Sequence, residues 1–157
     1  MKKKMIIKEQ KGVAAVEFAI ILPVLLLVLF GIIEFGIMFY DQAMMTNAAR
    51  EGARAGIVYI DEDDRLCNSG ITAVVNTYAQ NHLINFSSNS LVVPTSLRED
   101  KDGNPTVNCK GKSGGTLTVT VKYQYDFLLV PNMAELFPGG PFAKFQNLTA
   151  ICRMRFE

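Results

Sequence analysis

A long apolar run near the N-terminus constrains this chain more than any other feature. Sixteen residues, from Phe18 to Ile33, carry no polar side chain, and after Glu34 six more apolar residues lead to Tyr40. At about 1.5 Å per residue, a helix over 18–33 is roughly 24 Å long and one over 18–40 roughly 34 Å, which brackets a hydrocarbon core of about 30 Å. The run predicts a membrane-spanning helix with Glu34 near one interface.

The residues before this run predict its orientation. Only Glu9 offsets five lysines, which are Lys2, Lys3, Lys4, Lys8 and Lys11. Such a basic flank keeps an N-terminus cytoplasmic, so the residues after about 40 are expected outside. The sequence therefore predicts a single-pass protein of the inner (cytoplasmic) membrane, N-in, with the lipid bilayer as a partner and an extracytoplasmic C-terminal domain.

Gly12 and Glu17 make the segment more specific than a plain anchor. An ordinary secretory signal is cut after its apolar region at an Ala-x-Ala-like site, and the nearest such triplet, 53–55, lies twenty residues beyond Ile33. A charge such as Glu17 costs about 2.5–3.5 kcal/mol at the bilayer centre and less near the interface, so we expect it to have a partner. A cut after Gly12 supplies one, because the new ammonium on Val13 can pair with Glu17 of its own or a neighbouring subunit.

The quartet Gly12, Val13, Glu17 and Phe18, followed by the apolar run, resembles a class III prepilin signal peptide. The continuation through 34–40 and 46–54 resembles the TadE-like pseudopilins of tight-adherence, Flp-type pilus systems. The resemblance implies that a prepilin peptidase cuts between Gly12 and Val13, and that Glu17 and Phe18 act in assembly. The competing interpretation is a signal-anchored protein in which the glycine and the acid are accidental.

The same resemblance implies a structural role rather than an enzymatic one. We expect a minor pilin-like subunit, a pseudopilin involved in pilus assembly, secretion and cell adhesion. Its partners would be the prepilin peptidase, other pilin-like subunits contacted through the N-terminal helix, and an inner-membrane assembly platform. Two alternatives stay open: an uncleaved, membrane-tethered binding module that uses the acidic loop 61–64 or the Phe-rich loop 128–146, and a pseudopilin of a type II secretion system.

Three segments follow from these features: a cytoplasmic leader over 1–12, a membrane-spanning and extended helix over 13–58, and an extracytoplasmic head domain over 59–157. The helix is expected to continue past the membrane because 41–58 is Ala-rich and lacks proline. Removing 1–12 takes away five Lys and one Glu and changes the net charge from +1 to −3. No basic surface remains to favour nucleic acid.

Small residues four apart on this extended helix predict close packing. Ala48, Gly52 and Gly56 fall on one face, and each glycine costs about 1 kcal/mol relative to alanine inside a helix. A nearby surface should offset that cost. The protein's own sheet is the preferred partner and a neighbouring subunit the alternative.

The head domain is predicted to be α+β, which with the long N-terminal helix resembles a pilin. The pattern favours a second helix over 71–84 with Ser69 as its N-cap, and strands over 91–97, 106–110 and 116–127, with a further strand ending at Phe156. The clearest signal is 116–127, where apolar residues alternate with polar ones and one face becomes apolar.

Three cysteines complete the prediction. Cys67 and Cys109 fall in loop or edge contexts, whereas Cys152 belongs to the inward set of the last strand. For a domain in an oxidising compartment we predict a Cys67–Cys109 disulfide and a buried Cys152 thiol, although sequence alone leaves three pairings open. No spacing fits zinc, a phosphate-binding loop or a nucleophile with its base, so no catalytic residue, metal or cofactor is predicted.

Overall fold

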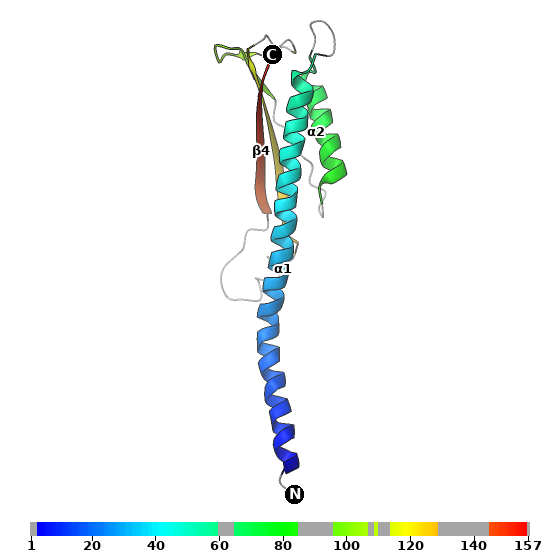
Figure 1. The fold of residues 1–157 in the computed structure, drawn as a ribbon, viewed down its shortest axis with the longest axis vertical. Helices are drawn as coiled ribbons and strands as arrows, with labels where there is room; N and C mark the ends of the chain where they lie inside the picture. The colour runs from blue at the N-terminus through cyan, green and yellow to red at the C-terminus, as the bar shows by residue number, and fades with distance from the viewer. Residues whose placement is uncertain are drawn as a thin grey trace. The chain divides into compact units, whose positions relative to one another are not determined.

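The computed structural model describes residues 3–59, 65–84, 96–106, 109, 114–128 and 145–156 (Figure 1). They form two helices and one four-stranded antiparallel sheet, which confirms the predicted α+β class with a long N-terminal helix. The acidic loop 61–64 lies outside the described residues, and so does most of the Phe-rich loop 128–146.

Helix α1, Lys3–Ile57, contains the whole predicted apolar segment and continues beyond it without a break (Figure 1). Pro23 lies inside the helix. A proline removes one backbone hydrogen bond, but alanines and leucines, which are strong helix formers, are frequent on both sides of it. The predicted end near residue 58 agrees with the observed end at Ile57.

Helix α2, Asn68–His82, starts earlier than predicted. Its first backbone bond runs from the N–H of Ile71 to the carbonyl of Cys67, at 3.0 Å, so Cys67 is the N-cap. The prediction of Ser69 as the N-cap was wrong, because the helix already begins at Asn68. Its buried residues are Ile71, Val75 and Ala79, one helical turn apart along a single face.

The sheet has the order β2-β1-β3-β4, with β1 at Leu97–Glu99, β2 at Pro105–Thr106, β3 at Thr116–Asp126 and β4 at Phe145–Arg155. The long strands β3 and β4 pair along their whole length. The predicted strand 91–97 overlaps β1 only at Leu97, and 91–95 lie outside the described residues. Strand β2 likewise lies at the start of the predicted 106–110 strand.

The alternation predicted for β3 is confirmed in its burial. Every second side chain is buried, in the set Leu117, Val119, Val121, Tyr123 and Tyr125. On β4 the inward set contains Leu148 and Ala150, while Ile151 is 65% exposed on the opposite face. The sheet therefore has one apolar and one solvated face, as antiparallel sheets commonly do.

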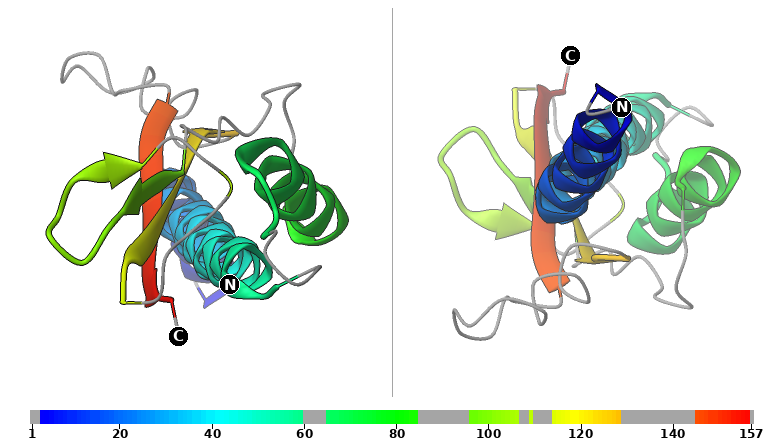
Figure 2. Two further views of the ribbon diagram at one scale, coloured as in Figure 1. Left: turned by 90° about the horizontal axis from the view of Figure 1, so that it is seen from above. Right: turned by 90° about the horizontal axis from the view of Figure 1, so that it is seen from below.

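The chain divides into two compact units. The smaller unit comprises Met1–Gly36 with Phe127–Phe142, and the larger unit comprises Ile37–Asp126 with Ala143–Glu157. In the larger unit, α2 and the sheet both lie alongside the C-terminal part of α1 (Figure 2). The core of this unit is formed by that part of α1, by α2 and by the inward faces of β3 and β4.

Candidate functional site: the exposed segment of α1

The segment 13–33 of α1 exposes nearly all of its large apolar side chains. Those about half exposed or more are Val13, Val16, Phe18, Ile20, Ile21, Val24, Leu25, Val28, Leu29, Ile32 and Ile33. Among the described residues, one helix is long and apolar enough to span a membrane, and no residue of its most apolar stretch is buried. A helix of this kind matches a bilayer because, apart from the bond that Pro23 removes, its backbone hydrogen bonds are made within the helix. The structure thus indicates a single-pass membrane anchor.

The predicted cleavage and assembly residues lie at the start of this segment. Gly12, Val13, Glu17 and Phe18 are all in α1 and all exposed. Val13 and Glu17 are four residues apart, so they share one face of the helix. The described part of the chain gives Glu17 no hydrogen-bond or ion-pair partner. Its carboxylate is exposed and is therefore accessible to a cation.

The second acid of the segment, Glu34, has a different environment. Its side chain is only 2% exposed, and its Oε1 accepts a hydrogen bond from the backbone N–H of Leu128. Beside it, the rings of Phe35 and Phe127 meet edge-to-face, with centroids 6.4 Å apart. The sequence predicted an interfacial acid here but gave no sign of this contact, because Leu128 lies 94 residues away along the chain.

The three small residues of the extended helix are buried within the larger unit. Ala48 has no exposed surface, and Gly52 and Gly56 are also buried. A Cβ on Gly52 would collide with Cγ2 of Val75, and one on Gly56 would lie 2.5 Å from Cδ2 of Leu117. Hence α1 approaches both α2 and β3 closely at these positions, and it does so within its own chain.

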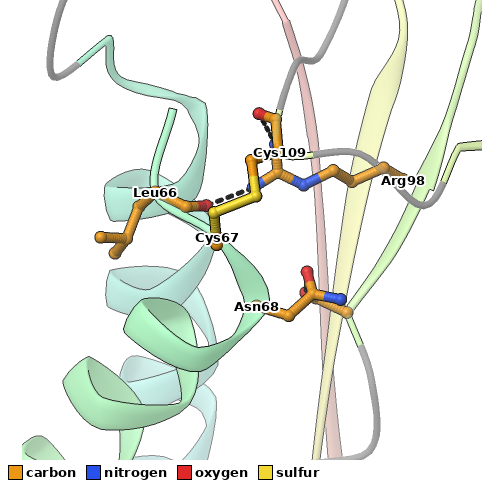
Figure 3. The surroundings of a disulfide bond; sticks show 6 residues. Leu66, Cys67, Asn68, Arg98 and Cys109 are labelled. Carbon is orange, nitrogen blue, oxygen red and sulfur yellow. Dashed lines mark hydrogen bonds between the residues drawn. A yellow bond between two sulfur atoms is a disulfide. The ribbon is translucent and has the colours of Figure 1, made fainter. Parts of the chain in front are cut away.

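A disulfide between Cys67 and Cys109 joins the start of α2 to the segment after β2, with 4.8 Å between the Cα atoms (Figure 3). Arg98 reaches it from β1 and donates to the carbonyls of Leu66 and Cys109, the latter at 2.8 Å. Burial lowers the pKa of Arg98, and the nearby Arg65 guanidinium lowers it further. The sequence analysis missed Arg98, because charged residues in strands normally face water.

Cys152 is a free thiol on β4 and is half-buried rather than fully buried as predicted. Burial raises the pKa of Cys152, while Arg50 on α1 opposes that shift. A raised pKa keeps the thiol protonated and unreactive near neutral pH. Cys152 therefore contributes to packing on β4 rather than to thiol chemistry.

Asp41 is a further buried acid that the sequence analysis missed. It has no exposed surface, and its Oδ1 accepts a hydrogen bond of 3.0 Å from the backbone N–H of Ile84. This bond fixes the chain that leaves α2 to α1 within the larger unit. Gln42, the next residue, donates to the carbonyl of Thr149 on β4 at 3.1 Å. One turn of α1 is thus hydrogen-bonded both to the residue pair that follows α2 and to strand β4.

The described residues bring no three His, Cys, Asp or Glu side chains together as a metal site. Residues 12–54 match the model of the TadE-like protein family. No curated protein and no solved structure matches the chain. The matched residues contain the exposed apolar segment, Glu17, and the buried Ala48 and Gly52. The resemblance drawn from the sequence is confirmed over this range: residues 12–54 are similar to the TadE-like protein family.

Proposed function

We propose that the chain is a minor, pilin-like structural subunit of a tight-adherence, Flp-type pilus or a related secretion apparatus. The TadE-like match supports a pilus-associated, minor pilin-like role. In this proposal the leader 1–12 is cytoplasmic and is removed by a prepilin peptidase between Gly12 and Val13. The processed protein then stays in the inner membrane, with its C-terminal part on the extracytoplasmic side. In the membrane it interacts with the assembly platform and with other pilin-like subunits.

The observation that carries the proposal is the exposed apolar segment with Glu17 at its base, a carboxylate that has no partner among the described residues. Large exposed apolar surfaces mark membrane or protein contacts, and here the surface is continuous around a helix. Glu17 is four residues after Val13, so an ammonium created at Val13 can approach it on the same or on an adjacent helix. Such an ion pair would favour a bundle of processed subunits over the uncut chain.

The first test is the N-terminal sequence of the protein from its native host. The proposal expects a mature chain that begins at Val13. A chain that retains Met1, with no shorter form, contradicts the processing step and supports an uncleaved membrane-tethered module instead. The membrane fraction should contain the protein in either case, so the measurement separates processing from anchoring.

The second test replaces Glu17 by alanine, with Glu17→Asp as the matched control that keeps the charge. A hydrogen bond to a charged group contributes about 1.5–3 kcal/mol, so losing it should reduce assembly on the order of ten- to a hundredfold. The readout is the number of pili per cell, beside membrane fractionation and the near-ultraviolet circular dichroism of the purified chain. Normal piliation in Glu17→Ala contradicts the assembly role.

A further inference from the structure

The chain that follows β3 is fixed to the membrane-spanning part of α1. Leu128 donates its backbone N–H to Glu34, and the ring of Phe127 contacts that of Phe35. All four residues belong to the smaller unit, which also contains the N-terminal part of α1. The contact therefore moves with the anchor.

The position of Glu34 along α1 gives the depth of this contact. From Gly12 to Glu34 the helix rises roughly 33 Å, at about 1.5 Å per residue, against a hydrocarbon core of about 30 Å. When the apolar segment spans the bilayer, Glu34 lies at the boundary between hydrocarbon and headgroups. A carboxylate at this depth loses part of its water, and the N–H of Leu128 replaces one of the lost hydrogen bonds.

The side chains around Glu34 are apolar and open to the surroundings. Leu128 is 45% exposed and Phe35 is 46% exposed. Glu34, to which Leu128 is hydrogen-bonded, directly follows Ile32 and Ile33, the exposed last residues of the apolar run. Phe and Leu side chains on interfacial segments are buried at the boundary between headgroups and acyl chains, which is the level of Glu34. The surface is continuous with the one that lipid covers, so lipid is also the occupant that fits it.

We propose that Phe35, Phe127 and Leu128 form an interfacial foot, a second lipid contact that rests in the headgroup region of the outer leaflet. The foot fixes how deep α1 sits, because sliding α1 outward would lift these side chains into water. It also adds to the free energy needed to extract the subunit from the membrane. This inference rests on the membrane insertion of α1 that the proposed function contains.

The experiment uses the absence of tryptophan from the chain. Three full-length variants each carry one reporter: Leu128→Trp in the foot, Val24→Trp in the middle of the apolar run, and Ile151→Trp as an exposed apolar control on β4. Each is reconstituted into vesicles of phosphatidylethanolamine and phosphatidylglycerol that contain lipids brominated either near the headgroup or deep in the acyl chain. The measured quantity is the loss of tryptophan fluorescence, with near-ultraviolet circular dichroism to verify folding.

The foot predicts that Leu128→Trp loses most fluorescence to the shallow bromines, Val24→Trp to the deep ones, and Ile151→Trp to neither. If Val24→Trp is quenched but Leu128→Trp behaves like Ile151→Trp, the foot is wrong while the anchor stands. Quenching of Ile151→Trp equal to that of Leu128→Trp also overturns it. If Val24→Trp is not quenched at all, the chain is not inserted and both proposals fail.

A second variant tests the role of Glu34 as a positioning residue. Adding Glu34→Ala to the Leu128→Trp chain removes the acceptor that holds Leu128. The shallow quenching should then decrease, whereas Glu34→Gln, which keeps an acceptor oxygen, should restore it in part. Unchanged shallow quenching in Glu34→Ala contradicts the positioning by Glu34.

Discussion

The two parts of α1 share one backbone but have opposite surfaces. From residue 13 to 33 the helix carries large aliphatic and aromatic side chains, and most of them are exposed. From Asp41 to Gly56 most of its buried apolar residues are small, with Ala48, Ala49 and Ala53 fully buried beside the larger Met45. Large apolar residues outside and small ones inside reverse the usual arrangement of a soluble helix.

The comparison shows that α1 has small residues where another element of the protein packs closely against it, and large residues where none does. In the larger unit α2 and β3 lie so close that Gly52 and Gly56 leave no room for a Cβ. In the smaller unit a Cβ on Gly31 or Gly36 would meet nothing within 4 Å. The first part of α1 has the surface of a membrane-spanning helix, whereas the second part fits one fixed protein interior.

The largest expected effect tests whether the fold of the larger unit is independent of the anchor. The disulfide closes a loop with a sequence separation of 42. Replacing both Cys67 and Cys109 by serine should lower the free energy of unfolding by about 4 kcal/mol, from the lost restriction of the unfolded chain. Urea denaturation in detergent micelles, followed by near-ultraviolet circular dichroism, measures it, and the anchor should remain helical.

Cys152→Ser is the matched control for this pair, since it also removes a thiol but no cross-link. It should change the urea midpoint far less than the double variant. Equal midpoints for the wild type and the double variant would show that the cross-link does not stabilise the larger unit.

The next prediction compares two apolar residues on the same helix. Met45 has no exposed surface, whereas Leu25 is 55% exposed. Met45→Ala should cost about 2–5 kcal/mol, because it removes buried contacts and leaves a cavity. Leu25→Ala should leave the urea midpoint of the larger unit unchanged. A similar loss of stability in Leu25→Ala would contradict the conclusion that only the C-terminal part of α1 contributes to the core of the larger unit.

A smaller effect is expected at the glycines. Gly52→Ala places a Cβ against Val75, and overpacking costs about 1–3 kcal/mol, which exceeds the gain of about 1 kcal/mol in helix propensity. Gly31→Ala has the same gain without the collision. The difference between the two variants in urea denaturation isolates the close approach of α1 and α2. A stabilised Gly52→Ala would mean that this approach can relax freely.

The smallest effect concerns pH. Burial raises the pKa of Cys152 above its ordinary value, so the folded state holds this proton more tightly than the unfolded state. The resulting stability is fully present below the unfolded pKa of about 8.5 and is lost as the pH rises through the higher folded pKa. Burial also raises the pKa of Tyr123, which acts in the same direction at higher pH.

Urea midpoints between about pH 8 and 10 should therefore decrease more steeply for the wild type than for Cys152→Ser. Tyr123 is present in both proteins, so the difference between them reports the thiol alone. Identical slopes would indicate that Cys152 titrates as it does in the unfolded chain.

Much of the fold follows from local patterns. The sixteen-residue apolar run predicts α1, and the period-two alternation of 116–127 predicts β3, because each pattern belongs to one kind of backbone. The signals failed where they were short. Strand β1 has three residues and β2 has two, which is too few for a periodicity, and the start of α2 has no side-chain cap to mark it.

The candidate site divides in the same way. The sequence alone predicts the cleavage and assembly residues Gly12, Val13, Glu17 and Phe18, because that prediction depends only on their spacing along the chain. Glu34 with Leu128 and Asp41 with Ile84 could not, because each contact joins residues far apart in the chain. A buried carboxylate has no local pattern that distinguishes it from an exposed one.

By itself, the sequence determined that this chain has an apolar helix of membrane-spanning length, a basic flank before it and an alternating strand after it. These are properties of consecutive residues, and elementary geometry converts them into the length of the helix and the two faces of the strand. Only the tertiary structure decided that Gly52 and Gly56 pack against α2 and β3, that Arg98 braces the disulfide, and that Glu34 holds Leu128. Those contacts depend on how distant segments meet, and the free energy that selects them comes from the whole packed core.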